Sequence, residues 1–129
     1  MNEHFAAADD RTAAAMMMEP FRPPTFRAEF PPHELDGLES LLTGRSTGEI
    51  AADSRFAVQV AEQLDEDGVA VCGVVAVTDT LTHVLATADG ATLAAAAAAS
   101  LGESSVRGLA TVARQATQRG GRLYCFWYF

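Results

Sequence analysis

The chain has 129 residues, a net charge of −8 and a hydrophobic fraction of 49%. This length favours one domain, and no run of about 18 strongly apolar residues predicts a membrane-spanning helix. All nine basic residues are arginine, which excludes mechanisms that need a lysine, such as Schiff-base catalysis or a P-loop. The negative charge argues against general affinity for nucleic acid or for an anionic membrane.

The N-terminus does not have the pattern of a secretory signal peptide. It carries Glu3, Asp9 and Asp10 where such a signal has basic residues, and its apolar stretch over residues 13–18 is short and is soon followed by Pro20. We therefore expect a cytoplasmic protein or a component of an assembled particle.

Residues 1–32 are expected to form an extended arm, because five prolines between positions 20 and 32 disfavour helix there. Large apolar side chains and arginines are interleaved with these prolines, and this composition is common at protein interfaces. The arm residues that we expect to contact a partner are Met17, Phe21, Arg22, Phe26, Arg27 and Phe30.

Two helices are predicted at the start of the following domain. Leucines at helical spacing indicate a helix over residues 33–43 that ends before Gly44. Ser46 and Glu49 have the S-x-x-E spacing of a capping box, and we expect the helix that starts there to continue to Leu64.

The second half of the domain is predicted to contain three strands and two helices. Residues 69–78 form an apolar, β-branched run typical of a central strand, and residues 81–87 are expected to return as its hairpin partner. An alanine-rich helix over residues 91–101 and a helix from Ser104 or Ser105 to the Gly120-Gly121 pair should precede a strand over residues 123–129.

The predicted fold class is therefore α+β, with a small, mostly antiparallel three-stranded sheet and the element order ααββααβ over residues 33–129. We expect the last strand at an edge of the sheet, where exposed aromatic residues invite pairing with other chains. Either Tyr124, Phe126 and Tyr128 face the core, or the arm or another subunit completes this region. The residues of the strand that we expect to contact a partner are Tyr124, Phe126, Trp127 and Phe129.

Charge is divided unevenly along the chain. Residues 34–103 contain twelve acidic residues against two arginines, whereas residues 104–129 contain no acidic residue. The C-terminal basic residues predict a small patch for an anionic partner, made of Arg107, Arg114, Arg119 and Arg122.

No catalytic, metal or cofactor site is expected from the sequence. Cys72 and Cys125 lie in apolar strand-like runs, which favours buried thiols, with a disulfide between adjacent strands as the alternative. Neither cysteine has a second ligand at the spacing of a zinc site. A serine, His83 and Asp79 are available for a hydrolytic triad, but the G-x-S-x-G turn is absent.

Two stretches resemble known families in outline. Residues 34–53, ELDGLESLLTGRSTGEIAAD, are similar to the helix pair of LuxR-type helix-turn-helix regulators, although the following residues 56–64 are apolar where that family has a polar recognition helix. Residues 56–121 are similar to the roadblock dimerisation fold in their expected order of helix, two strands, helix and strand. Neither resemblance assigns the chain to a family.

We expect a non-catalytic assembly or adaptor subunit of a larger complex, such as a virion component or an accessory subunit of an enzyme complex. Its partner would be another protein chain, with a second copy of itself among the candidates. The alternatives are a roadblock-like or transcription-associated regulatory binding module, and an enzyme whose active site is shared across an interface.

Overall fold

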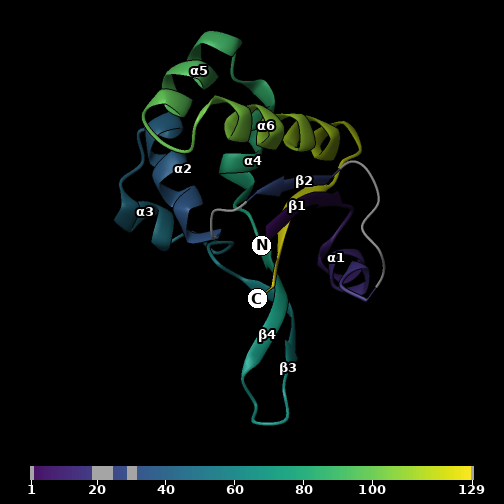
Figure 1. Cartoon of the computed structure of the whole chain (residues 1–129). Coiled ribbons are helices and arrows are strands. Elements are labelled where there is room, and N and C mark those ends of the chain that lie inside the picture. Colours follow the sequence, from purple (N-terminus) through teal and green to yellow (C-terminus); the bar gives the residue numbers. More distant parts are fainter. Residues whose placement is uncertain (1, 19–24, 29–31, 129) are drawn as a thin grey trace.

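The computed structural model describes residues 2–18, 25–28 and 32–128 (Figure 1). These residues form an α+β fold in which six helices pack on a five-stranded antiparallel sheet. The elements in chain order are β1 (Asn2–Ala7), α1 (Asp10–Met16), β2 (Thr25–Ala28), a 3-10 turn (Pro32–Glu34), α2 (Leu35–Thr43), α3 (Thr47–Ala51), β3 (Gln59–Leu64), β4 (Ala70–Ala76), α4 (Asp79–Thr87), α5 (Gly90–Ala98), α6 (Glu103–Gln118) and β5 (Arg122–Tyr128).

The strand order across the sheet is β2-β1-β5-β4-β3. β5 is therefore the central strand, pairing with β1 through Phe5 and Tyr124 on one side and with β4 through Val75 and Cys125 on the other. The predicted edge position of this strand was wrong, because the N-terminal strand covers the side that was expected to be open.

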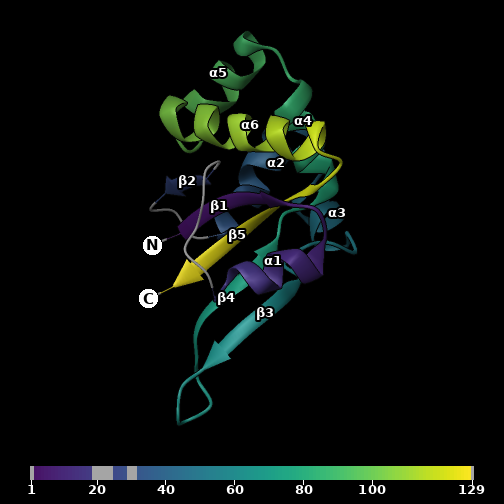
Figure 2. The same cartoon turned by 90° about the vertical axis from the view of Figure 1, so that its right-hand side faces the viewer.

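The helices form two unequal layers on the sheet. α2, α4, α5 and α6 lie over one face, and α1 lies over the other, while the β3–β4 hairpin extends away from the helical layers (Figures 1 and 2). Two separate apolar clusters follow from this arrangement, one between the sheet and the large helical layer and one beneath α1.

Local capping explains where several helices begin. Asp9, Thr78 and Asp89 each accept a hydrogen bond from a backbone N–H in the first turn of α1, α4 and α5, respectively. The predicted capping box is confirmed, since Ser46 and Glu49 each accept from the other's backbone N–H at the start of α3.

The extended N-terminal arm does not match the structure. Residues 2–7 and 25–28 are strands of the sheet, and residues 10–16 form a helix. Phe5 is fully buried under α1, so burial of apolar surface holds this segment on the domain. The prolines that suggested an arm lie outside β1, α1 and β2.

The three-stranded sheet and two of the predicted elements also need correction. α3 ends at Ala51, and residues 59–64 form strand β3 instead of continuing the helix. Residues 79–87 form helix α4 instead of a strand, because the Thr78 cap starts a helix that buries Leu81 and Leu85 one turn apart. The helices predicted over residues 33–43, 91–101 and 105–119, and the strands over 69–78 and 123–129, are confirmed apart from their ends.

These differences remove the patterns on which both family resemblances depended. Strand β3 and helix α4 stand where the roadblock-like order needs a helix and a strand. The helix pair over residues 34–53 forms as α2 and α3, but a strand follows it where a recognition helix would lie.

Candidate functional site

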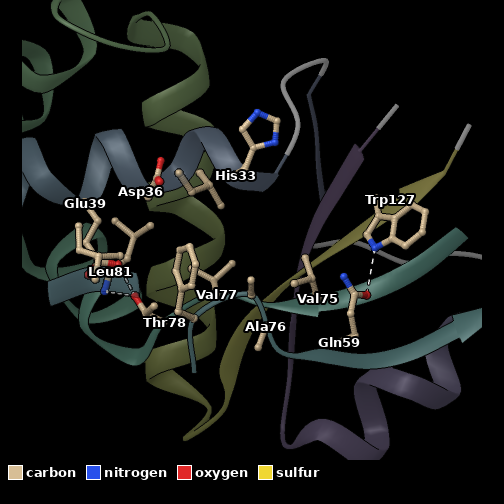
Figure 3. Close-up of a pocket in the computed structure, with 14 residues that line it drawn as sticks. His33, Asp36, Glu39, Gln59, Val75, Ala76, Val77, Thr78, Leu81 and Trp127 are labelled. Atoms are coloured by element: carbon tan, nitrogen blue, oxygen red, sulfur yellow. Dashed lines mark hydrogen bonds between the residues drawn. The ribbon is translucent and has the colours of Figure 1, made fainter. Parts of the chain in front are cut away.

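A pocket of about 280 Å³ lies between α2 and the face of the sheet that carries Val75 and Val77 (Figure 3). Its walls come from distant parts of the chain: the start of α2, the region from α3 to β3, strand β4, the start of α4, and the end of β5.

The walls are mainly apolar. Val75 on β4 and Val77, just after the end of that strand, both line the pocket, because side chains two residues apart along an extended chain share one face. Ile50 and Leu81 line the pocket and are each 1% exposed, so they are held firmly by the surrounding packing.

A buried carboxylate closes one end of the pocket. Glu39 is 1% exposed, its Oε2 lies 2.8 Å from Nη1 of Arg45, and its Oε1 accepts a hydrogen bond from the Thr78 hydroxyl. Arg45 also lies 3.3 Å from Asp53. The arginine and the hydroxyl compensate the cost of burying the Glu39 charge, and they hold the carboxylate in one orientation.

An indole lines the other end (Figure 3). Trp127 on β5 donates a hydrogen bond from Nε1 to Oε1 of Gln59 on β3, at 3.2 Å. The ring lies over Gly73 on the intervening strand, where a Cβ atom would approach it to 2.8 Å and the Ala61 carbonyl oxygen to 2.8 Å. Glycine at position 73 is therefore required for this placement of the indole.

The remaining polar groups lie on the α2 side. His33 is exposed in the turn before α2, and Asp36 is half-buried in the first turn, where its Oδ1 accepts from the Gly37 N–H at 2.7 Å. Of the described residues that line the pocket, none is an arginine. The site thus combines apolar walls with carboxylates, one amide, one hydroxyl and one imidazole, groups suited to holding a ligand through a few directed contacts.

The predicted partner contacts fall in several different places. Trp127 lines the pocket, Tyr124 is fully buried and donates a hydrogen bond to Asp10 at 2.7 Å, and Phe126 packs against the cluster beneath α1. Met17 also packs against that cluster, as Phe26 does against the other one. The members that lie outside the described residues are Phe21, Arg22, Phe30 and Phe129.

The four arginines of the predicted anionic-partner patch differ in their contacts with carboxylates. Arg107 and Arg114 lie exposed on α6, where Arg107 pairs with Glu103, and Arg119 is exposed at the end of that helix. Arg122 lies 3.4 Å from Asp79 and 4.0 Å from Asp10. The side chain of Arg27 pairs with Glu3 across the β1–β2 pair.

Both cysteines are free thiols. Cys125 is buried, as expected, and burial raises the pKa of its thiol to about 12. Cys72 is only half-buried. The described residues hold no group of three or more His, Cys, Asp or Glu side chains arranged to bind a metal ion.

Sequence reasoning missed the polar end of the pocket. Glu39 follows Leu38 on the buried side of α2, and a carboxylate placed within such an apolar stripe is itself a signal of a buried partner. The identity of that partner depends on tertiary contacts with Thr78, which is far along the chain.

The fold and the pocket define this chain as an α+β protein with a five-stranded antiparallel sheet and a small, mostly apolar cavity on one of its faces. No protein-family model, curated protein or solved structure matches it. Within its described helices, none has both the length and the apolar character needed to cross a membrane.

Proposed function

We propose that this chain is a non-catalytic binding module that holds a small molecule in the pocket between α2 and the sheet. The observation that carries the proposal is the composition of that pocket, which has apolar walls and a few fixed polar groups at its ends. Small-molecule sites in proteins have this character, with apolar surface providing affinity and a few polar groups providing orientation.

The size of the pocket limits its ligand. Its volume of about 280 Å³ lies just below the range for ligand sites, about 300–1,000 Å³. A single substituted ring or a short branched chain fits this space, whereas a dinucleotide does not.

The existing contacts favour binding over catalysis. Glu39 is engaged by Arg45 and Thr78, and Gln59 is engaged by Trp127. Groups fixed by such contacts are suited to orienting a ligand, while a general acid or base needs to reach the reacting atoms directly.

Trp127 provides a direct test, because it is the only tryptophan in the chain and lines the pocket. Binding of a small aromatic compound should change its fluorescence in a saturable way. Val75→Phe places a ring in the pocket and should abolish that binding while circular dichroism shows that the fold is retained.

Val69→Phe is the matched control, since Val69 is 58% exposed whereas Val75 is 4% exposed. The control should bind as the unmodified protein does. Unchanged binding by a folded Val75→Phe variant would place the site elsewhere and contradict the proposal.

An assembly role is the second candidate, and the open side of β3 favours it. In the described sheet β3 pairs with β4 alone, and Leu64 at its end is 53% exposed. Strands at a sheet edge can pair with another chain. In this second candidate function, the partner is another protein chain or a second copy of this one. The protein would then be cytoplasmic or part of an assembled particle.

Size-exclusion chromatography with light scattering over a range of protein concentrations tests self-assembly through this edge. Leu64→Lys should shift the chain toward the monomer. The matched control is Leu41→Lys, because Leu41 is 51% exposed but lies on α2. A chain that is monomeric at every concentration contradicts self-assembly.

A further inference from the structure

The polar groups around the pocket carry a charge of predominantly one sign. Asp36 and Glu39 line it, and the only titratable base among the described lining residues is His33. Arg45 contacts Glu39 without lining the pocket itself.

Counting the charges around Glu39 gives a net negative site. Arg45 neutralises one carboxylate but lies between two, since it is 2.8 Å from Glu39 and 3.3 Å from Asp53. With Asp36, three carboxylates stand against one guanidinium, which leaves two negative charges near a mostly apolar pocket. Apolar walls reduce screening, so such charges act more strongly than they would in open solvent.

Glu39 keeps unused hydrogen-bonding capacity. An ionised carboxylate has about four lone-pair sites, and the described contacts of this group use one oxygen for Thr78 and the other for Arg45. Because Glu39 lines the pocket, its remaining lone pairs are the acceptors that a ligand donor on the α2 side would use.

The opposite end of the pocket can hold the apolar part of a ligand whose donor group lies near Glu39. Trp127 and Phe56 contribute aromatic rings to its lining. Aromatic rings attract both apolar groups and cations, and tryptophan attracts cations most strongly. The molecule as a whole carries a net charge of −8, which adds to the repulsion of anions.

We propose that the pocket selects a small amphiphilic amine, with an apolar or aromatic body and a protonated amino group directed at the acidic α2 side. This inference rests on the proposed function, since it assigns a ligand class to the same pocket. It excludes carboxylates and phosphates of similar size as ligands.

Three probes of similar shape but different charge test this selection: phenethylamine, phenethyl alcohol and hydrocinnamate. Titration of the full chain, followed by Trp127 fluorescence and by calorimetry, should show that the amine binds about tenfold more tightly than the alcohol. Hydrocinnamate should bind more weakly than either. The preference for the amine should decrease as salt is added, because Asp36 is partly exposed.

Asp36→Asn should reduce the preference for the amine over the alcohol severalfold. Asp67→Asn is the matched control, because it removes the same charge at the exposed turn between β3 and β4, away from the pocket lining. Glu39→Gln keeps one acceptor oxygen for Arg45 and places an NH2 group where it can donate to the Thr78 hydroxyl. It should weaken amine binding further in a chain that circular dichroism shows to be folded.

The outcomes separate this inference from the proposed function. Equal binding of amine and alcohol, or tighter binding of hydrocinnamate, overturns the amine selection while the pocket remains a binding site. Failure of all three probes to bind, in a chain shown to be folded, overturns the proposed function and the amine selection together.

Discussion

Gly108 on α6 allows the Phe26 ring of β2 to lie directly against the helix. A Cβ atom at this position would overlap the ring of Phe26. Phe26 also packs on the larger apolar cluster, so this contact joins a short outer strand to the helical layer.

We predict that Gly108→Ala destabilises the protein, although alanine favours helix over glycine by about 1 kcal/mol. The ring has to move, and overpacking of this kind costs about 1–3 kcal/mol. Chemical denaturation should show the loss, and Phe26→Ala in the same chain should remove most of the additional cost of the alanine.

Gly37→Ala is the matched control, because no atom lies within 4 Å of a Cβ built at that position in α2. It should stabilise the protein by about 0.5–1 kcal/mol. If Gly108→Ala gave the same stabilisation, the contact between Phe26 and α6 would be contradicted.

At the scale of elements, strong local signals predicted structure well. The apolar β-branched run of β4 and the aromatic run of β5 are strands, and the glycines at positions 44 and 102 separate helices as expected. Gly44 has a φ of 74° and Gly102 a φ of 92°, conformations that favour glycine over other residues.

Weaker sequence patterns led to wrong predictions where tertiary packing decides between the helical and the strand periodicity. The apolar residues of segment 59–64 can be placed on one face of a continuing helix, but as β3 the segment pairs with β4 along its length. Residues 81–87 alternate enough to suggest a strand, yet the Thr78 cap and the buried Leu81 and Leu85 make them a helix.

The candidate site was predictable only in part for a related reason. Trp127 was singled out as a contact residue, and it lines the pocket. The hydrogen bond from Trp127 to Gln59 crosses the intervening strand β4, and the hydrogen bond from Thr78 to Glu39 joins α4 to α2. The first contact could not be predicted because residues 59–64 were expected to continue a helix, and the second depends on how α2 and α4 pack together.

At the scale of the whole molecule, β1 lies inside the sheet and brings a titratable side chain into the interior. His4 on β1 is fully buried, and the centroid of its ring lies 6.3 Å from that of Phe26. Burial lowers the pKa of His4 from 6.5 to about 4, because loss of hydration disfavours the charged imidazolium.

The stability of the fold should therefore decrease on mild acidification. In the unfolded chain His4 gains a proton as the pH falls through 6.5, whereas in the folded chain it stays neutral until the pH reaches about 4. The unfolded state binds more protons within this window. The contribution of His4 to the free energy of unfolding is therefore complete above pH 6.5, and the free energy of unfolding falls by about 3 kcal/mol toward pH 4.

Denaturant titrations between pH 7 and pH 2 measure this change, and His4→Phe should remove most of it above pH 4. The Asp10 carboxylate should add a separate loss at lower pH, because hydrogen bonds from Arg55 and Tyr124 lower its pKa from 3.8 to about 2. This second loss should persist in His4→Phe. His83→Gln, which changes an exposed histidine on α4, serves as the control. An unaltered dependence between pH 6.5 and pH 4 in His4→Phe would contradict the role of β1 as a buried, pH-sensitive strand of the sheet.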